Sequence, residues 1–133
     1  METPGASCAI LLVESNPMLR DYLQRLLRLR FPLVELSVAA GEREALHRVA
    51  ERAPDLILVH VRAGQGRGFD LVRRLRRVVA GARVAVLSDQ DLPEYRAEAL
   101  RCGADHFLEK TALRSEDILD LVRAAAPSGN KQF

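Results

Sequence analysis

Five short apolar runs along the chain alternate with five longer stretches of helical periodicity. Three of the runs, Ala9–Val13, Leu56–Val59 and Val84–Leu87, are continuously apolar, as expected for strands buried on both faces of a parallel sheet. The runs Val34–Val38 and His106–Glu109 alternate between apolar and polar residues, which is typical of strands with one less buried face. The pattern therefore predicts a sheet with three interior strands and two edge strands.

The longer stretches carry apolar residues at the spacing of amphipathic helices. The first begins with Asn16 as an N-cap and Pro17 in the first turn. The fourth has Asp91 and Glu94 at the spacing of a capping box, and Gly103 follows it as a stop signal. The second and third helices are expected at about 42–52 and 69–79, and the fifth from Ser115. Alternating strands and helices predict an α/β fold, a doubly wound parallel sheet with strand order 2-1-3-4-5.

The length of 133 residues suits a single domain. We expect this domain to span residues 8–126, after a short N-terminal extension over 1–7 and before a tail over 127–133 whose small and polar residues predict disorder. Cys8 and Cys102 lie far apart, so neither a disulfide framework nor a metal-ligand spacing is expected. The first residues lack the pattern of a secretory signal and no apolar run is long enough to span a bilayer. We therefore expect a cytoplasmic protein with no membrane partner.

Arginine dominates the basic residues. The net charge is +2, and eighteen of the twenty Lys and Arg residues are arginine. Arg73, Arg74, Arg76 and Arg77 lie close together in the sequence, a pattern that nucleic-acid-binding surfaces also show. No aromatic residues that stack on bases are interleaved with them. We interpret the cluster as a solvated helix face and expect no direct nucleic-acid binding by this domain.

Chemically interesting side chains follow the predicted strands at their carboxyl ends, where doubly wound sheets gather their functional residues. Those positions hold Glu14, Ser15, His60, Ser88 and Lys110. Because the strands are parallel, we expect these five residues to meet at one edge of the sheet, near the switch point between the first and third strands.

Three motifs at this edge resemble those of response-regulator receiver domains, and the resemblance covers nearly the whole chain. They are the segments Ile10–Pro17, Pro54–His60 and Gly103–Lys110. The segment that begins Pro93-Glu94-Tyr95-Arg96 is similar to regulators that carry a helix-turn-helix output domain. The resemblance implies a flavodoxin-like (βα)5 fold and a role in two-component or phosphorelay signal transduction.

The resemblance also assigns a role to each matching position. In the family an aspartate accepts phosphate, two further acids hold Mg²⁺, and a hydroxyl and a lysine hold the transferred phosphate. Ser88 matches the hydroxyl, Lys110 the lysine, Glu14 one acid and Phe107 the switch aromatic. The departures are Ser15, which stands where the second acid belongs, and His60, which stands where the phosphoacceptor aspartate belongs.

These departures change the charge of the predicted pocket. Three carboxylates and one lysine demand a divalent cation, whereas Glu14, Lys110 and a neutral His60 sum to zero. Magnesium prefers carboxylate and water to imidazole. We therefore expect a degenerate pocket with no metal or other cofactor and no enzymatic activity. Glu14 and Lys110 are expected to form an ion pair.

The leading interpretation is a degenerate pseudo-receiver that acts in signal transduction by binding proteins, independently of aspartyl phosphorylation. The expected partner is a signalling protein or an output domain. The expected contact surface is the family's fourth helix, fifth strand and fifth helix, at roughly 93–102, 106–109 and 115–125, and it predicts a weak homodimer.

Several alternatives remain open from the residues alone. One is a phosphorelay receiver that accepts phosphate at His60. Another is the receiver part of a DNA-binding transcriptional regulator whose output domain is absent from this chain. A transition-metal site that uses His60 and Glu14 has only two ligands. A flavin site is disfavoured because the loop at Glu14–Pro17 is short and acidic. The plainest reading of His60 is a packed, hydrogen-bonded histidine at the end of a buried strand.

Overall fold

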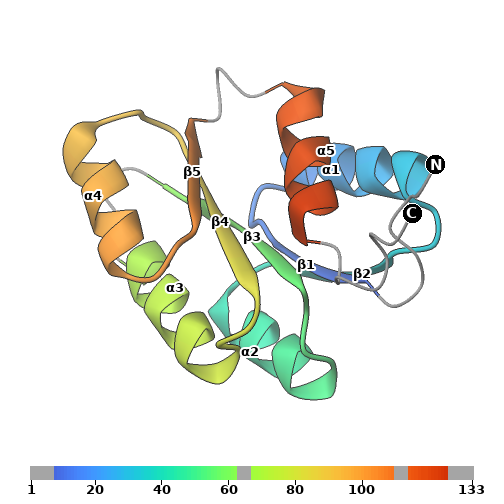
Figure 1. Ribbon diagram of the computed structural model, residues 1–133, viewed down its shortest axis with the longest axis horizontal. Coiled ribbons are helices and arrows are strands. Elements are labelled where there is room, and N and C mark those ends of the chain that lie inside the picture. The colour runs from blue at the N-terminus through green and yellow to red at the C-terminus, as the bar shows by residue number, and fades with distance from the viewer. Residues whose placement is uncertain (1–7, 63–66, 110–113, 126–133) are drawn as a thin grey trace.

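The computed structural model describes residues 8–62, 67–109 and 114–125. These residues form five strands and five helices in strict alternation (Figure 1). The elements are β1 (Ala9–Val13), α1 (Pro17–Arg30), β2 (Glu35–Ala39), α2 (Glu42–Glu51), β3 (Leu56–Val61), α3 (Arg67–Val78), β4 (Arg83–Ser88), α4 (Pro93–Arg101), β5 (His106–Glu109) and α5 (Ser115–Ala125). The expected N-terminal extension and tail lie outside the described residues.

The strands form one parallel sheet in the order β2-β1-β3-β4-β5, which confirms the predicted topology. The interior strands β1, β3 and β4 are the continuously apolar runs of the sequence, and β2 and β5 are the edges. The observed bounds differ from the expected ones by only one or two residues, which is the usual uncertainty of element ends. One of these differences matters, because β3 continues through His60 to Val61.

Helices cover both faces of the sheet (Figure 1). Helices α1 and α5 pack on one face, and α2, α3 and α4 pack on the other. Successive residues of a strand point to opposite faces, so each interior strand supplies side chains to both cores. In β1, for example, Ile10 and Leu12 enter the core under α1 and α5, whereas Leu11 and Val13 enter the core under α2, α3 and α4. This double burial explains the continuous apolar runs Ala9–Val13 in β1, Leu56–Val59 in β3 and Val84–Leu87 in β4.

The structure confirms the predicted N-cap of α1 and the glycine after α4, but not the predicted capping box of α4. The side chain of Asn16 caps α1 by accepting hydrogen bonds from the backbone N–H groups of Met18 and Leu19. Gly103 follows α4 with a φ of 109°, a conformation that glycine adopts readily. The expected capping box of α4 is wrong, because Leu92 is the N-cap and makes no side-chain cap bond. Asp91 instead forms an ion pair with Arg96 at 2.9 Å.

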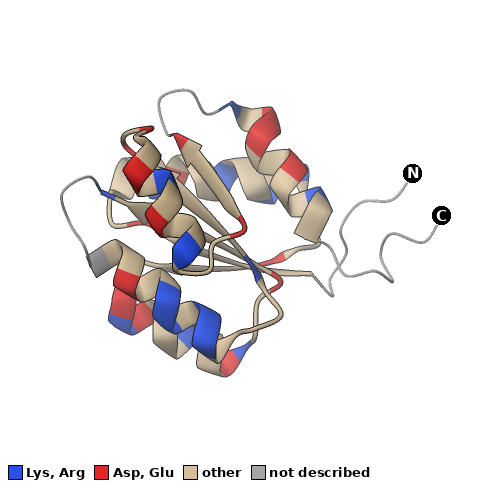
Figure 2. Ribbon diagram, turned by 60° about the vertical axis from the view of Figure 1, so that its left-hand side comes forward, with Lys and Arg blue, Asp and Glu red and all other residues tan. Residues whose placement is uncertain are grey.

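Basic residues gather along α3 (Figure 2), and three of the four arginines of the cluster form ion pairs within the domain. Arg76 donates hydrogen bonds to the carbonyl oxygens of Ala80, Ala82 and Gly103 and pairs with Asp105 at 2.6 Å. Two of its neighbours also pair with carboxylates: Arg73 with Asp70 and Glu98, and Arg74 with Glu42. These internal contacts favour a structural role over a nucleic-acid-binding one.

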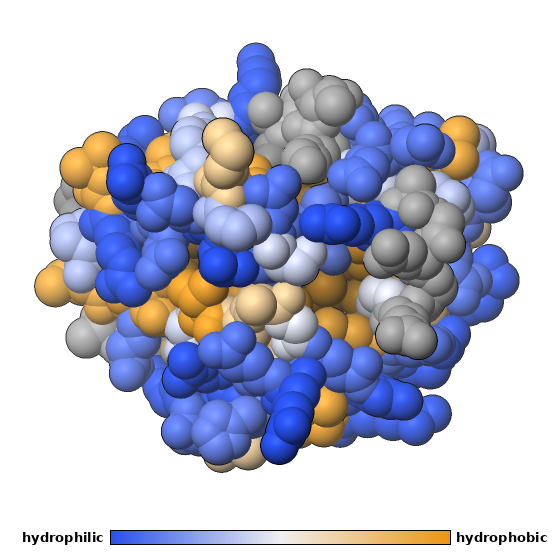
Figure 3. Space-filling model, turned by 180° about the vertical axis from the view of Figure 1, so that it is seen from behind, coloured by the Kyte–Doolittle hydropathy of each residue, from blue (hydrophilic) through white to orange (hydrophobic). Residues whose placement is uncertain are grey.

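The surface seen from behind is mainly hydrophilic, with hydrophobic side chains exposed in separate patches and in a central hollow (Figure 3). Among the described residues, no helix has the length and apolar character needed to cross a membrane.

Candidate functional site

The sheet topology places His60 between two acidic residues. His60 lies one residue before the end of β3, whose neighbours in the sheet are β1 and β4. Glu14 directly follows β1 and Asp89 directly follows β4. Because the three strands are parallel and in register, their carboxyl ends bring these side chains together.

Both ring nitrogens of His60 contact a carboxylate. The distance from Nδ1 to Oε2 of Glu14 is 2.8 Å, and the distance from Nε2 to Oδ1 of Asp89 is 2.7 Å. The His60 side chain is 3% exposed and that of Glu14 is 0% exposed, whereas that of Asp89 is 36% exposed. An imidazole donates hydrogen bonds from both nitrogens only when it is protonated. Two carboxylate acceptors therefore favour the imidazolium form.

The electrostatics of the site favour the same form. Burial lowers the pKa of His60, because it penalises the charged ring. The hydrogen bonds and negative charges of Glu14 and Asp89 outweigh this effect, and the pKa of His60 lies above its ordinary value. The raised pKa and the two carboxylate acceptors thus favour a charged ring over the neutral histidine expected from the sequence.

The imidazolium of His60 compensates the negative charge of the buried Glu14 carboxylate. Its Oε2 accepts hydrogen bonds from His60 and from the backbone N–H of Asn16 at 2.9 Å. Its Oε1 is buried and has no hydrogen-bond partner among the described residues. Arg20 approaches only the backbone, donating to the carbonyl oxygen of Glu14 at 2.9 Å. The expected ion pair between Glu14 and Lys110 stays a prediction, because Lys110 lies outside the described residues.

Three other predicted residues, Ser15, Ser88 and Phe107, lie among the described residues, and Ser15 lines a pocket together with His60. Ser88 is buried, donates to the carbonyl oxygen of Gln90 at 2.9 Å and lies 3.2 Å from the Gln90 backbone N–H, so its hydroxyl holds the turn after β4. Ser15 is exposed. Phe107 is buried, and the guanidinium of Arg96 lies 4.8 Å from the centre of its ring.

Asp89 is the site residue that the sequence reasoning missed. Its signal was available, since an acid directly after β4 lies at the same edge of the sheet as Glu14 and His60. The family match assigns a role to Ser88 but none to the residue after it, so Asp89 is not among the predicted site residues.

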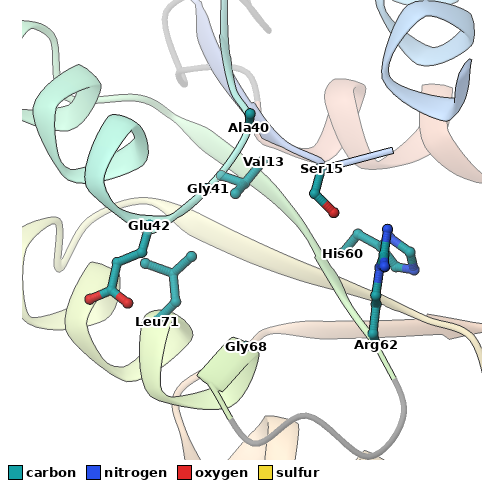
Figure 4. A pocket seen from close by; sticks show the side chains of 9 residues that line it. All are labelled: Val13, Ser15, Ala40, Gly41, Glu42, His60, Arg62, Gly68 and Leu71. Atoms are coloured by element: carbon teal, nitrogen blue, oxygen red, sulfur yellow. The ribbon is translucent and has the colours of Figure 1, made fainter. Parts of the chain in front are cut away.

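A pocket of about 270 Å³ opens beside His60 (Figure 4). Figure 4 shows Ser15, His60 and Arg62 on one side, and Glu42 of α2 and Leu71 of α3 on the other. Glu42 forms an ion pair with Arg74. Within residues 8–62, 67–109 and 114–125, no group of three or more His, Cys, Asp or Glu side chains is arranged to hold a metal ion.

Comparison with known proteins identifies the architecture around this site. The model of the response regulator receiver domain family matches residues 10–123. The chain belongs to this family. It is thus a receiver domain of the kind found in two-component response regulators, as the motifs at the sheet edge suggested.

Two relatives and one structure illustrate the match. The nitrate/nitrite response regulator protein NarL of Escherichia coli K12 is 28% identical over 88% of this chain and 54% of its own length. The virulence transcriptional regulatory protein PhoP of Salmonella typhimurium 14028s is 30% identical over 76% of this chain and 44% of its own. The chain thus spans about half the length of these relatives. A response regulator from Thermotoga maritima has the same fold, with a TM-score of 0.78, 21% identity and coverage of 90% of this chain and 97% of that one.

The residues at the carboxyl edge do not fit the Mg²⁺ ion that the family implies. Mg²⁺ needs about six oxygen ligands in octahedral geometry. Here Oε2 of Glu14 and Oδ1 of Asp89 are both turned to the imidazole of His60, which Mg²⁺ does not favour as a ligand. A protonated His60 would also repel a divalent cation.

Proposed function

We propose that this receiver domain signals by binding proteins, without phosphorylation of an aspartate. The observation that carries the proposal is His60, which stands at the position of the family's phosphoacceptor and contacts a carboxylate through each ring nitrogen. The carboxylate that would form an acyl phosphate is therefore missing from the end of β3.

Phosphate transfer to His60 itself is disfavoured by the same contacts. A histidine accepts a phosphoryl group through the lone pair of a neutral ring nitrogen, and protonation removes that lone pair. The raised pKa of His60 favours the protonated ring. An incoming phosphoryl group would also meet the negative charges of Glu14 and Asp89 on either side of the ring. Glu14 is buried, where like-charge repulsion is screened least.

A second candidate role concerns an output domain as the partner. The chain spans about half of each relative described above, and PhoP is named as a transcriptional regulatory protein. We infer that a DNA-binding output domain is one partner that this receiver domain would serve, either in the same polypeptide or in another. The surface formed by α4, β5 and α5 is the proposed contact for such a partner and for a weak homodimer.

Incubation with acetyl phosphate and Mg²⁺, followed by intact mass spectrometry, tests the proposal. We expect the mass to stay unchanged, while a receiver domain with an aspartate at the acceptor position gains one phosphate under the same conditions. A base-labile adduct would indicate an acyl phosphate and contradict the proposal. An acid-labile adduct mapped to His60 would establish the phosphorelay alternative.

A further inference from the structure

Arg62 is one of the residues that line the pocket beside His60 (Figure 4). Among the residues that the structure describes, its side chain makes no hydrogen bond and no ion pair. The other charged side chains of the lining are engaged, because both ring nitrogens of His60 contact carboxylates and Glu42 pairs with Arg74. Arg62 is therefore the charged group through which this pocket can hold a ligand.

The charges around the pocket favour a ligand with a single negative charge. The imidazolium of His60 carries one positive charge and its two carboxylate partners carry two negative ones, which leaves −1. The pair of Glu42 and Arg74 is neutral. Arg62 therefore attracts an anion against surroundings that are already negative, so a monoanion is favoured over a dianion such as phosphate. A carboxylate also matches the planar guanidinium with two parallel hydrogen bonds.

The far side of the pocket from Arg62 is apolar. Val13 at the end of β1 and Leu71 of α3 line it, and both are buried in the core under α2, α3 and α4 (Figure 4). The pocket volume of about 270 Å³ equals that of about nine water molecules at about 30 Å³ each. A ligand that fills this space has about nine non-hydrogen atoms, most of them apolar.

We propose that this pocket binds a small monocarboxylic acid whose carboxylate pairs with Arg62 and whose apolar body packs against Val13 and Leu71. The hydroxyl of Ser15, which also lines the pocket, is a further hydrogen-bond donor for the carboxylate. Binding of this kind involves no covalent step and no metal ion, and Ser88 is not among the lining residues. The inference goes beyond the proposed function and does not depend on it.

Benzoate is the probe, because it carries one carboxylate on an apolar ring and has nine non-hydrogen atoms. Benzamide and benzamidine have the same size and shape but are neutral and positively charged, respectively. Acetate has the carboxylate without the ring, and inorganic phosphate is an anion without an apolar body. Each compound is titrated into the whole ¹⁵N-labelled chain, and the chemical shifts of the backbone amides measure its affinity and its place of binding.

We expect benzoate to bind with a Kd on the order of 1 mM and to shift the amides of lining residues such as Ser15, Gly41 and Gly68. The four other compounds should each bind at least about tenfold more weakly, because each lacks either the carboxylate or the ring.

Three variants test the role of the guanidinium. Arg62→Gln keeps a donor but removes the charge, and it should weaken benzoate binding by about tenfold. Arg62→Lys keeps the charge without the planar pair of donors, so its affinity should fall between those of Arg62→Gln and the wild type. Arg77→Gln, on α3 and outside the pocket lining, is the matched control and should bind as the wild type does. Circular dichroism checks that each variant keeps its fold.

The proposal is overturned if benzoate leaves the spectrum unchanged at ten times the expected Kd, or if its shifts map to another surface. It is also overturned if benzamide, benzamidine or phosphate binds as tightly as benzoate, or if Arg62→Gln weakens binding no more than Arg77→Gln does. The acetyl phosphate experiment measures a covalent change in mass, whereas these titrations measure reversible binding. A failure here is therefore distinguishable from a failure of the proposed function.

Discussion

Replacing His60 by glutamine removes the cation between two carboxylates while keeping a side chain that can donate one hydrogen bond. Glu14 is fully buried and its Oε1 has no partner among the described residues, so it would lose its compensating charge. Removing one member of a buried ion pair typically costs about 3–5 kcal/mol. The amide donor of glutamine offsets part of this loss, and Asp89 is partly solvated. We therefore expect the free energy of unfolding to fall by about 3 kcal/mol, the lower end of that range.

The difference between wild type and His60→Gln should depend on pH with a defined sign. The pKa of His60 in the folded chain is raised, and in the unfolded chain it is about 6.5. Below the unfolded value both states bind the proton, and the stabilisation is fully present. Between the two values only the folded state binds it, so stability falls as pH rises. The stabilisation by His60 is lost once the pH passes the raised folded pKa.

Urea denaturation of both proteins at a series of pH values from about 5.5 to 9 measures this difference. A matched control is His47→Gln, because His47 is 70% exposed and pairs with Glu51 at 3.6 Å. An exposed pair contributes at most about 1 kcal/mol. If His60→Gln costs no more than His47→Gln, or if its cost does not decline as pH rises, then His60 is not a buried cation and our account of the site is wrong.

Three further predictions concern metal binding, stability and assembly. His60→Asp alone should bind Mg²⁺ weakly, whereas His60→Asp combined with Ser15→Asp should show clear binding in calorimetry; equal binding by both would show that Ser15 matters little. Arg76→Ala should lower the free energy of unfolding by about 2–3 kcal/mol, because it leaves three carbonyl oxygens and Asp105 without their charged donor. Arg77→Ala, a change at an exposed neighbour, should cost less than about 0.5 kcal/mol in the same chemical denaturation. Sedimentation velocity should reveal a weak homodimer, and a strict monomer at high concentration would exclude it.

The fold could be read from the sequence because its signals are local. A strand segment buried on both faces is apolar at successive positions, and Ala9–Val13, Leu56–Val59 and Val84–Leu87 show this pattern within a few residues each. The N-cap at Asn16 is equally local, since its side chain reaches backbone groups two and three residues away. The capping box predicted at Asp91 is wrong because the sequence pattern does not show which other donors compete for the carboxylate. A guanidinium five residues along, that of Arg96, takes the carboxylate instead.

The site was predicted less well because its chemistry depends on distant residues. Glu14 and His60 are 46 positions apart, and His60 and Asp89 are 29 positions apart. The sequence predicted that the first two would meet at one sheet edge, and they do. It could not predict the protonation of His60, because the pKa of a buried histidine follows from the balance between burial and its neighbours. The neutral ring assumed from the sequence omitted both the hydrogen bond from Glu14 and the whole contribution of Asp89.

A bound metal ion can dissociate from a receiver domain, whereas a histidine side chain cannot, and this difference affects how the domain is regulated. A divalent ion and a phosphoryl group come and go, so each can favour one of two conformations by binding it more tightly. The charge on His60 is covalently part of β3, and through Glu14 and Asp89 it links the segments that follow β1 and β4. Ser88, whose counterpart in the family binds phosphate, is hydrogen-bonded to Gln90 in its own turn. His60 itself cannot dissociate as a metal ion does, so below its raised pKa the site offers no ligand-dependent difference between two states. At constant pH, the proposed function therefore requires the signal to arrive as the concentration or binding of a partner protein or of the small acid proposed for the neighbouring pocket.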